Sequence, residues 1–368
     1  VLNFTSDPKK VSNVKSRFNF SKNKIFIKEF IFKEGKNKID IKNLKIKNNK
    51  LEKFDNINVL TFTNDVKNNN FKISLKDKIY IKGHTYDSTL LVKLLKSNTK
   101  SNFLNNINKK IEIKFENVMT RSFLPLKKFN LLGIIEKGQF IKINSKSEYA
   151  ENKYLDISLS KNKDGKKKLE IFTDSPKLLL ADFKSFDGIN DGKLLFTSVI
   201  EKSKSKSKSK LLIEDFKILK APTFATLLTL ADLGGVADLL SGEGISFDSL
   251  EIILEEDPQT IKIQEVLAMG PSISILMNGY FEKNSELISL SGTMVPAKNL
   301  NKLISKIPLV GRILVGKQMG EGIFGVSFKV KGLLGKVKTS VNPIKTLTPR
   351  FILRAVEKIK KKNQKKTK

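Results

Sequence analysis

The sequence predicts a mainly β protein with a few short amphipathic helices. From its pattern alone the strands could form either a closed β-sandwich or a long, curled antiparallel sheet with an extended groove, and we expect the groove on the resemblance described below. Three observations predict the strands. Apolar and polar residues alternate along many short segments, Asn- and Gly-rich breaks separate these segments, and the apolar residues are mostly Ile, Leu and Phe, with 25 Phe and no Trp. Branched and aromatic residues favour strands, and period-two alternation gives each strand one apolar face and one wet face.

The alternation recurs through the first two hundred residues. The segments share apolar residues two apart: Ile39 and Ile41, Phe71 with Ile73 and Leu75, Ile79 and Ile81, Ile111 with Ile113 and Phe115, Leu155 with Ile157 and Leu159, and Leu169 and Ile171. The breaks Asn68-Asn69-Asn70 and Asp164-Gly165 have the composition of turns. Together they predict an antiparallel meander.

Helices are expected at four places. Asp87 can cap a short helix that carries leucines at 90–95, and Pro222 opens a leucine-rich helix over 222–241. A third helix is expected over 298–307, before Pro308, and a basic amphipathic one at the start of the tail 350–368. We expect a repetitive β segment over 1–214, a distinct domain over 215–349 and a basic, partly disordered tail.

The net charge of +32 comes almost entirely from Lys, since only five of the 69 basic residues are Arg. Recognition of phosphate and bases usually relies on the planar Arg side chain, so no nucleic-acid partner is expected. The remaining alternatives are solvated strand faces enriched in Lys by codon bias, and contact with an anionic membrane surface. The Lys-Ser run at 202–210 is expected to be a loop between two strands.

Residues suited to catalysis are scarce. His84 is the only histidine and stands at a strand end, where a structural role is expected. Gly242-Glu243-Gly244 and Gly320-Glu321-Gly322 precede strands and indicate turns, and Glu255-Glu256-Asp257 before Pro258 indicates a hairpin. The chain has no Cys, which excludes disulfides and thiolate metal sites. We therefore expect no enzyme activity, no catalytic residue, no cofactor and no metal.

The C-terminal third carries an ordered series of motifs. These are Ala221-Pro222-Thr223, Leu240-Ser241-Gly242-Glu243-Gly244, Met269-Gly270-Pro271, Asn278-Gly279, Ser291-Gly292-Thr293-Met294-Val295-Pro296, Ile307-Pro308-Leu309-Val310-Gly311, Gly320-Glu321-Gly322 with Phe324-Gly325, and Val341-Asn342-Pro343. In this order they resemble the AsmA-like C-terminal domain of bacterial envelope proteins, especially the YhdP branch, over about 215–353. Gly83-His84-Thr85-Tyr86-Asp87-Ser88 resembles a recurring turn of the same family.

The resemblance implies a periplasmic protein of the cell envelope, anchored in the inner membrane by an N-terminal helix that this chain lacks. It implies a long apolar β-groove that carries phospholipid toward the outer membrane, and no catalytic residues. The expected partners are phospholipid acyl chains, the two membranes and other envelope proteins. The rival hypothesis is a structural or assembly factor for outer-membrane biogenesis that moves no lipid.

Alternation does not assign the inward side of the groove, because in places both the odd-numbered and the even-numbered positions of a strand are apolar. As a working choice, we expect eight residues of alternate strand positions to contact lipid: Ile245, Phe247, Ile273, Ile275, Phe324, Val326, Phe328 and Val330. Acyl chains would lie against these side chains while headgroups stay in water, and each buried CH₂ would contribute about 0.8 kcal/mol.

Overall fold

The structure is a computed structural model that describes residues 11–89, 105–122, 124–149, 153–181, 188–201, 206–219, 228, 243–296, 325–333 and 335–344. These residues form 20 strands and one short helix, α2 (Pro176–Leu180). The predicted mainly β, mostly antiparallel architecture is confirmed, because the described strands pair mostly antiparallel, whereas the extended groove stays a prediction. The chain divides into two compact units, Val1–Ser185 and Phe186–Lys368. The boundaries predicted at residues 214 and 349 stay predictions.

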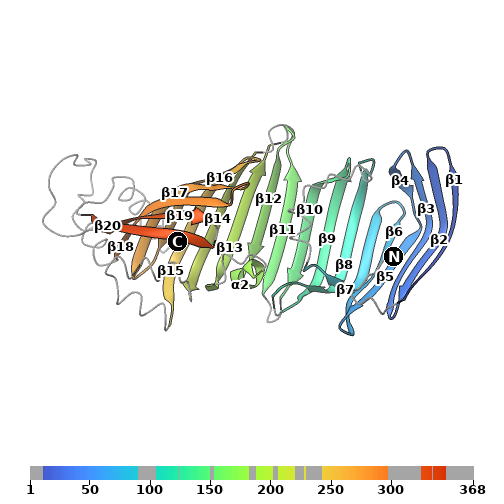
Figure 1. Cartoon of the computed structure of the whole chain (residues 1–368), viewed down its shortest axis with the longest axis horizontal. Coiled ribbons are helices and arrows are strands. Elements are labelled where there is room, and N and C mark those ends of the chain that lie inside the picture. The colour runs from blue at the N-terminus through green and yellow to red at the C-terminus, as the bar shows by residue number, and fades with distance from the viewer. Residues whose placement is uncertain are drawn as a thin grey trace, which may run out of the picture. The chain divides into compact units, whose positions relative to one another are not determined.

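The strands of the first unit lie side by side nearly in chain order (Figure 1). They are β1 (Ser12–Ser21), β2 (Lys24–Glu34), β3 (Asn37–Lys47), β4 (Lys50–Lys53), β5 (Asn56–Thr63), β6 (Val66–Leu75), β7 (Ile79–Asp87), β8 (Lys109–Met119), β9 (Leu126–Glu136), β10 (Gln139–Glu148), β11 (Tyr154–Lys161) and β12 (Lys167–Thr173). Strands β4 and β5 both pair with β3, so they follow one another along its edge.

One ladder departs from the predicted antiparallel meander. Strand β8 pairs with β7 in parallel, with Ile79 opposite Ile111 and Ile81 opposite Ile113. A parallel partner needs a long connection that returns the chain to the end where the first strand began. Residues 88–108 provide a connection of that length. Alternation of apolar residues indicates which face of the sheet a side chain lies on, but not the direction of a strand. The sequence pattern therefore could not reveal that β7 and β8 are parallel.

The predicted turns have different outcomes. Asp164-Gly165 does form a turn between β11 and β12, and Gly165 has a φ of 81°. The prediction for Asn68-Asn69-Asn70 is wrong, because these residues lie inside β6. The actual turn is Asn64-Asp65, where both residues adopt positive φ, of 48° and 62°. Asn and Asp tolerate the left-handed region, so this pair forms a tight hairpin turn.

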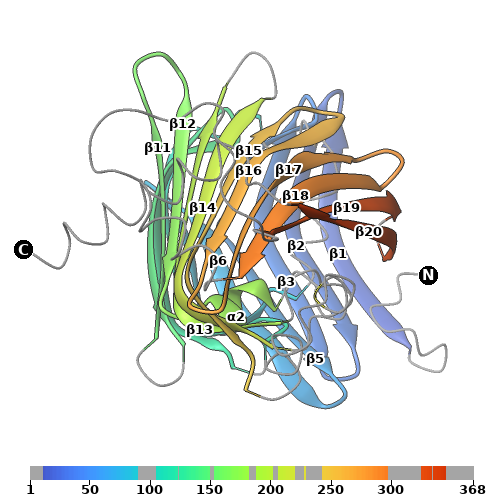
Figure 2. The same cartoon turned by 90° about the vertical axis from the view of Figure 1, so that its left-hand side faces the viewer.

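The second unit repeats the arrangement, and its strands curve from β13 toward β20 (Figure 2). They are β13 (Ile189–Ile200), β14 (Ser207–Ile218), β15 (Ile245–Glu256), β16 (Thr260–Met269), β17 (Ile273–Glu282), β18 (Leu287–Pro296), β19 (Gly325–Leu333) and β20 (Lys336–Ile344). Each described ladder in this unit joins neighbours in the chain and is antiparallel.

The Lys-Ser run is partly strand, which corrects the predicted loop. Residues 207–210 belong to β14, where Lys208 pairs with Glu255 at 2.9 Å and Lys210 with Glu251 at 3.2 Å. These carboxylates on β15 offset the repulsion between lysines that the sequence suggested. The predicted hairpin at Glu255-Glu256-Asp257 is confirmed, since β15 ends at Glu256 and β16 begins at Thr260.

Helix α2 was not predicted, although Ser175-Pro176 before three leucines is a helix-start pattern. Its Leu178 and Leu179 pack against a buried cluster in the first unit: Phe115, Val118, Leu126, Tyr149 and Leu155. The helices predicted after Asp87, over 298–307 and in the tail lie outside the described residues. So does the one over 222–241, apart from Leu228, which is buried.

Candidate functional site

Most of the predicted lipid-contacting residues are buried side chains of the second unit. Ile245, Phe247, Ile273, Val326, Phe328 and Val330 are 0% to 7% exposed. Ile275 is half-buried, and Phe324 lies outside the described residues. The prediction therefore selected apolar positions that the fold does cover.

Five of these residues belong to one face of the sheet formed by β17–β19. Ile275 lies opposite Met294, which lies opposite Val326. The next row runs through apolar side chains and one glycine: Ile252, Val266, Met277, Gly292, Phe328 and Val341. Directly opposed residues share a face, so these rows make a continuous apolar surface across β15–β20. Ile273 and Val330 extend it along their strands.

The other face of the same strands is mixed, since Leu267 and Val295 on it are buried, at 2% and 0% exposed. A row of exposed side chains crosses it through Asn278, Ser291, Lys329 and Ser340. Successive residues of a strand point to opposite faces, so this row lies behind the apolar one. The second unit therefore has one apolar face and one face on which an exposed polar row lies beside buried apolar residues.

Ile245 and Phe247 sit at the start of β15, beside β14. Phe247 lies opposite Phe216, and their rings stack with centroids 5.4 Å apart and an interplanar angle of 13°. Sequence reasoning missed Phe216. In β14 both Ile213 and Phe216 are buried although they are three residues apart, and Asp215 between them has a φ of 53°. Such a break in alternation explains why parity could not assign the inward side.

The first unit also has apolar rows on one face of its sheet, and these cross more strands. One apolar row crosses seven strands through Phe30, Ile41, Ile57, Ile73, Ile81, Ile113 and Leu131. A parallel row runs through Phe32, Ile39, Val59, Phe71, Gly83, Phe115 and Phe129. Most of these side chains are half-buried, which leaves apolar surface within reach of a ligand.

Opposite these rows lies a polar row rich in lysine. It runs through Asp40, Asn58, Lys72, Lys82, Lys114, Asn130, Lys146 and Asp156. Lysines directly opposite one another repel, so this arrangement costs stability unless carboxylates offset it. Glu112 does so for part of the row, with Oε2 2.6 Å from Lys78 and Oε1 2.9 Å from Lys114 and 3.5 Å from Lys82.

The ion pairs of Glu112 change its acidity. Hydrogen bonds from Lys78 and then Lys114, together with their positive charges, lower the pKa of Glu112 from its ordinary 4.5 to about 2. The hydrogen bond to Glu112 in turn raises the pKa of Lys78. Glu112 is therefore charged under all ordinary conditions and holds three lysines of the polar face together.

The Gly83-His84-Thr85 segment forms an irregularity in β7. Phe71 pairs with Gly83 and Asn70 with Thr85, so His84 is the extra residue of a β-bulge. The imidazole Nδ1 of His84 contacts the Glu116 carboxylate on β8. Beyond the bulge Tyr86 stacks on Phe115, with centroids 5.3 Å apart, and meets Phe71 edge-on at 5.9 Å. The histidine thus lies at a bulge, where its exposed ring contacts a carboxylate.

The described residues contain neither a cluster suited to a metal ion nor a helix suited to a bilayer. No three acidic or histidine side chains there come close enough together to hold a metal ion. Within the same residues, the structure contains no helix with the length and apolarity needed to span a bilayer. Comparison with protein-family models, with curated proteins and with solved structures also finds no match to the chain. The AsmA-like assignment remains a prediction from the motif order.

Proposed function

We propose that this chain is a non-enzymatic cell-envelope protein that binds phospholipid acyl chains along the apolar face of its sheet. It would conduct phospholipid between the inner and outer membranes and so support outer-membrane lipid homeostasis. The observation that supports this proposal is the set of apolar rows that cross successive strands in register, with polar rows directly behind them.

The dimensions of the apolar rows suit a hydrocarbon ligand. Seven strands at a spacing of about 4.8 Å give a row about 29 Å long, which is close to the thickness of a bilayer core. Transfer of an acyl chain onto such a row would remove its methylene groups from water at about 0.8 kcal/mol each. Since the rows repeat with similar side chains from strand to strand, a chain could shift along them with little change in free energy. The proposed conduction is therefore passive.

The test measures lipid that stays with the purified full-length chain. We would purify the chain from bacterial membranes in mild detergent and record bound phospholipid by native mass spectrometry. The test variant Ile41→Gln/Ile57→Gln alters two half-buried, directly opposed residues of the apolar face. Its control, Lys42→Gln/Asn56→Gln, alters the neighbouring opposed pair on the polar face.

The proposal expects phospholipid on the wild type and on the control pair, and loss of phospholipid from the apolar-face pair. Circular dichroism would establish that both variants keep their strands. A well-folded wild type that carries no phospholipid, or a loss of the same size in both variants, would contradict lipid binding on this face. In that case the structural or assembly role becomes the better hypothesis.

Conduction needs a second readout. Fluorescent phospholipid would be followed from donor to acceptor vesicles, with the wild type expected to speed the transfer and the apolar-face pair expected to leave it at the spontaneous rate. Lipid binding without faster transfer would favour a lipid-binding scaffold over a conduit.

A further inference from the structure

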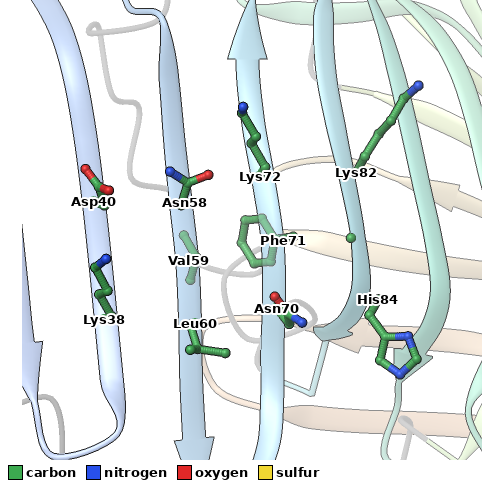
Figure 3. A pocket seen from close by; sticks show the side chains of 11 residues that line it. Lys38, Asp40, Asn58, Val59, Leu60, Asn70, Phe71, Lys72, Lys82 and His84 are labelled. Atoms are coloured by element: carbon green, nitrogen blue, oxygen red, sulfur yellow. The ribbon is translucent and has the colours of Figure 1, made fainter.

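The polar face of the first unit carries a pocket of about 390 Å³ over β3, β5, β6 and β7 (Figure 3). Val59, Phe71 and Gly83 of the second apolar row also line it, whereas Ile41 and Ile57 of the first apolar row do not. Its polar lining comes from two cross-strand rows, with Asp40, Asn58, Lys72 and Lys82 in one and Lys38 and Asn70 in the other.

The charge of this pocket is positive and only partly neutralised. Lys82 shares the Glu112 carboxylate with Lys78 and Lys114. Lys38 and Lys72, both exposed, form no ion pair with any described residue. Lys72 lies directly opposite Lys82, so an anion between the two would remove a repulsion that the fold otherwise bears.

The pocket also contains a hydrogen-bond acceptor without a donor. Asp40 Oδ1 is buried and receives no hydrogen bond from the described residues. A buried carboxylate oxygen left in this way costs stability, and a donor on a ligand would satisfy it. The row therefore offers an acceptor at Asp40, an amide at Asn58 and cations at Lys72 and Lys82 (Figure 3).

We infer that this pocket binds a phosphate ester that also carries an amine. The phosphate would lie among Lys38, Lys72 and Lys82, and the amine would donate to Asp40. Phosphate attracts lysine as a compact charge without demanding the planar fork of arginine, which agrees with a site built only of lysine. The ligand chemistry is that of phosphoethanolamine, either as a free ester or as a lipid headgroup.

Two variants of equal charge test whether the pocket is a site or only part of a basic surface. Lys38→Gln/Lys72→Gln removes the two unpaired pocket lysines. Lys142→Gln/Lys146→Gln removes two exposed lysines of β10, outside the pocket. At fixed ionic strength, calorimetric titration of the full chain with glycerophosphoethanolamine is expected to show about tenfold weaker binding for the pocket pair, or about 1.4 kcal/mol. The control pair should bind like the wild type.

Asp40→Asn should change the affinities for two ligands in opposite directions. It should weaken the binding of glycerophosphoethanolamine, because the amine loses its carboxylate partner. It should tighten the binding of inorganic phosphate, because a negative charge leaves the pocket. Equal weakening by both lysine pairs, or the same direction of change for both ligands in Asp40→Asn, would overturn the site. Neither surface variant removes a core side chain, and thermal unfolding would verify that each is folded.

Vesicles then distinguish the two sources of the ligand. Binding of the chain to phosphatidylethanolamine vesicles that falls with Lys38→Gln/Lys72→Gln identifies the lipid headgroup. Vesicle binding that is unchanged, while glycerophosphoethanolamine binding falls, identifies a soluble ester. Because the apolar-face variant Ile41→Gln/Ile57→Gln leaves this pocket intact, failure of the lipid-conduction proposal would not remove the site.

Discussion

The ring of Phe328 lies over Gly292, its direct neighbour across β18 and β19. A Cβ added to Gly292 would stand 2.7 Å from the Phe328 Cζ, 2.5 Å from the Met277 Cβ and 2.6 Å from the Leu276 carbonyl oxygen. The glycine therefore leaves the space that the aromatic ring fills on the apolar face, an arrangement in which an aromatic side chain covers a strand glycine.

Gly292→Ala should destabilise the second unit by about 1–3 kcal/mol, because the new methyl group meets backbone atoms as well as side chains. Denaturant unfolding measures the change. Ser291→Ala, on the exposed face of the same strand, should stay within about 0.5 kcal/mol of the wild type. Equal stability of Gly292→Ala and the wild type would show that β17 and β18 are further apart than the structure places them.

Gly83→Ala should disturb the bulge in β7. The added methyl group would collide with the Asn70 carbonyl oxygen and with Phe71 in β6, so the β6–β7 ladder must open or shift. We expect a loss of about 1–3 kcal/mol and faster amide exchange in β6 and β7. Gly35→Ala is the comparison, since its positive φ of 55° brings strain but a Cβ there meets no atom within 4 Å. Exchange confined to β7 alone would argue against the close approach.

The Phe216–Phe247 stack should carry much of the packing where β14 meets β15. Both rings are nearly fully buried, at 1% and 2% exposed, so Phe247→Ala should cost about 3–5 kcal/mol. A double-mutant cycle with Phe216→Ala should reveal a coupling of about 0.5–1.5 kcal/mol from the stacked geometry. Additive effects of the two changes would mean that the rings are buried independently. For the same reason, Phe247→Asp is unsuitable for testing lipid binding, because it would disrupt the fold.

The pKa of Glu112 predicts acid sensitivity. Its value in the folded chain, about 2, is below the ordinary value of 4.5, so the contribution of Glu112 to stability is fully present above pH 4.5. It is lost progressively as the pH falls from about 4.5 toward about 2. Glu112→Gln should therefore lower stability at neutral pH and flatten this part of the stability curve.

Thermal unfolding at a series of pH values measures the effect. The exposed Glu52→Gln serves as the control, because Glu52 lies in the same unit and forms no ion pair with a described residue. A wild-type curve with the same slope as that of Glu112→Gln between pH 4.5 and 2 would contradict the role given to Glu112.

The sequence determined the fold class and the two-sided character of the sheet. In β6, the apolar Ile73 stands between the polar residues Lys72 and Ser74. Because adjacent strand residues point to opposite faces, this alternation predicts one apolar and one polar face. The residues of the lipid-contacting surface were in part predictable for the same reason. Phe328 and Val330 were selected as apolar residues two apart, and they do share one face.

Only the tertiary structure decided which distant residues meet. Register between strands placed Gly292 beneath Phe328 and brought Lys72 opposite Lys82, and no local pattern specifies such a pairing. Backbone irregularities also change which face a residue points to. The left-handed Asp215 and the extra residue His84 interrupt the alternation from which faces are assigned. The direction of β8 and the neutralisation of three lysines by Glu112 likewise depend on contacts between strands. Sequence alternation is a local consequence of strand geometry, whereas register, strand direction and charge pairing are set by the free energy of the whole sheet.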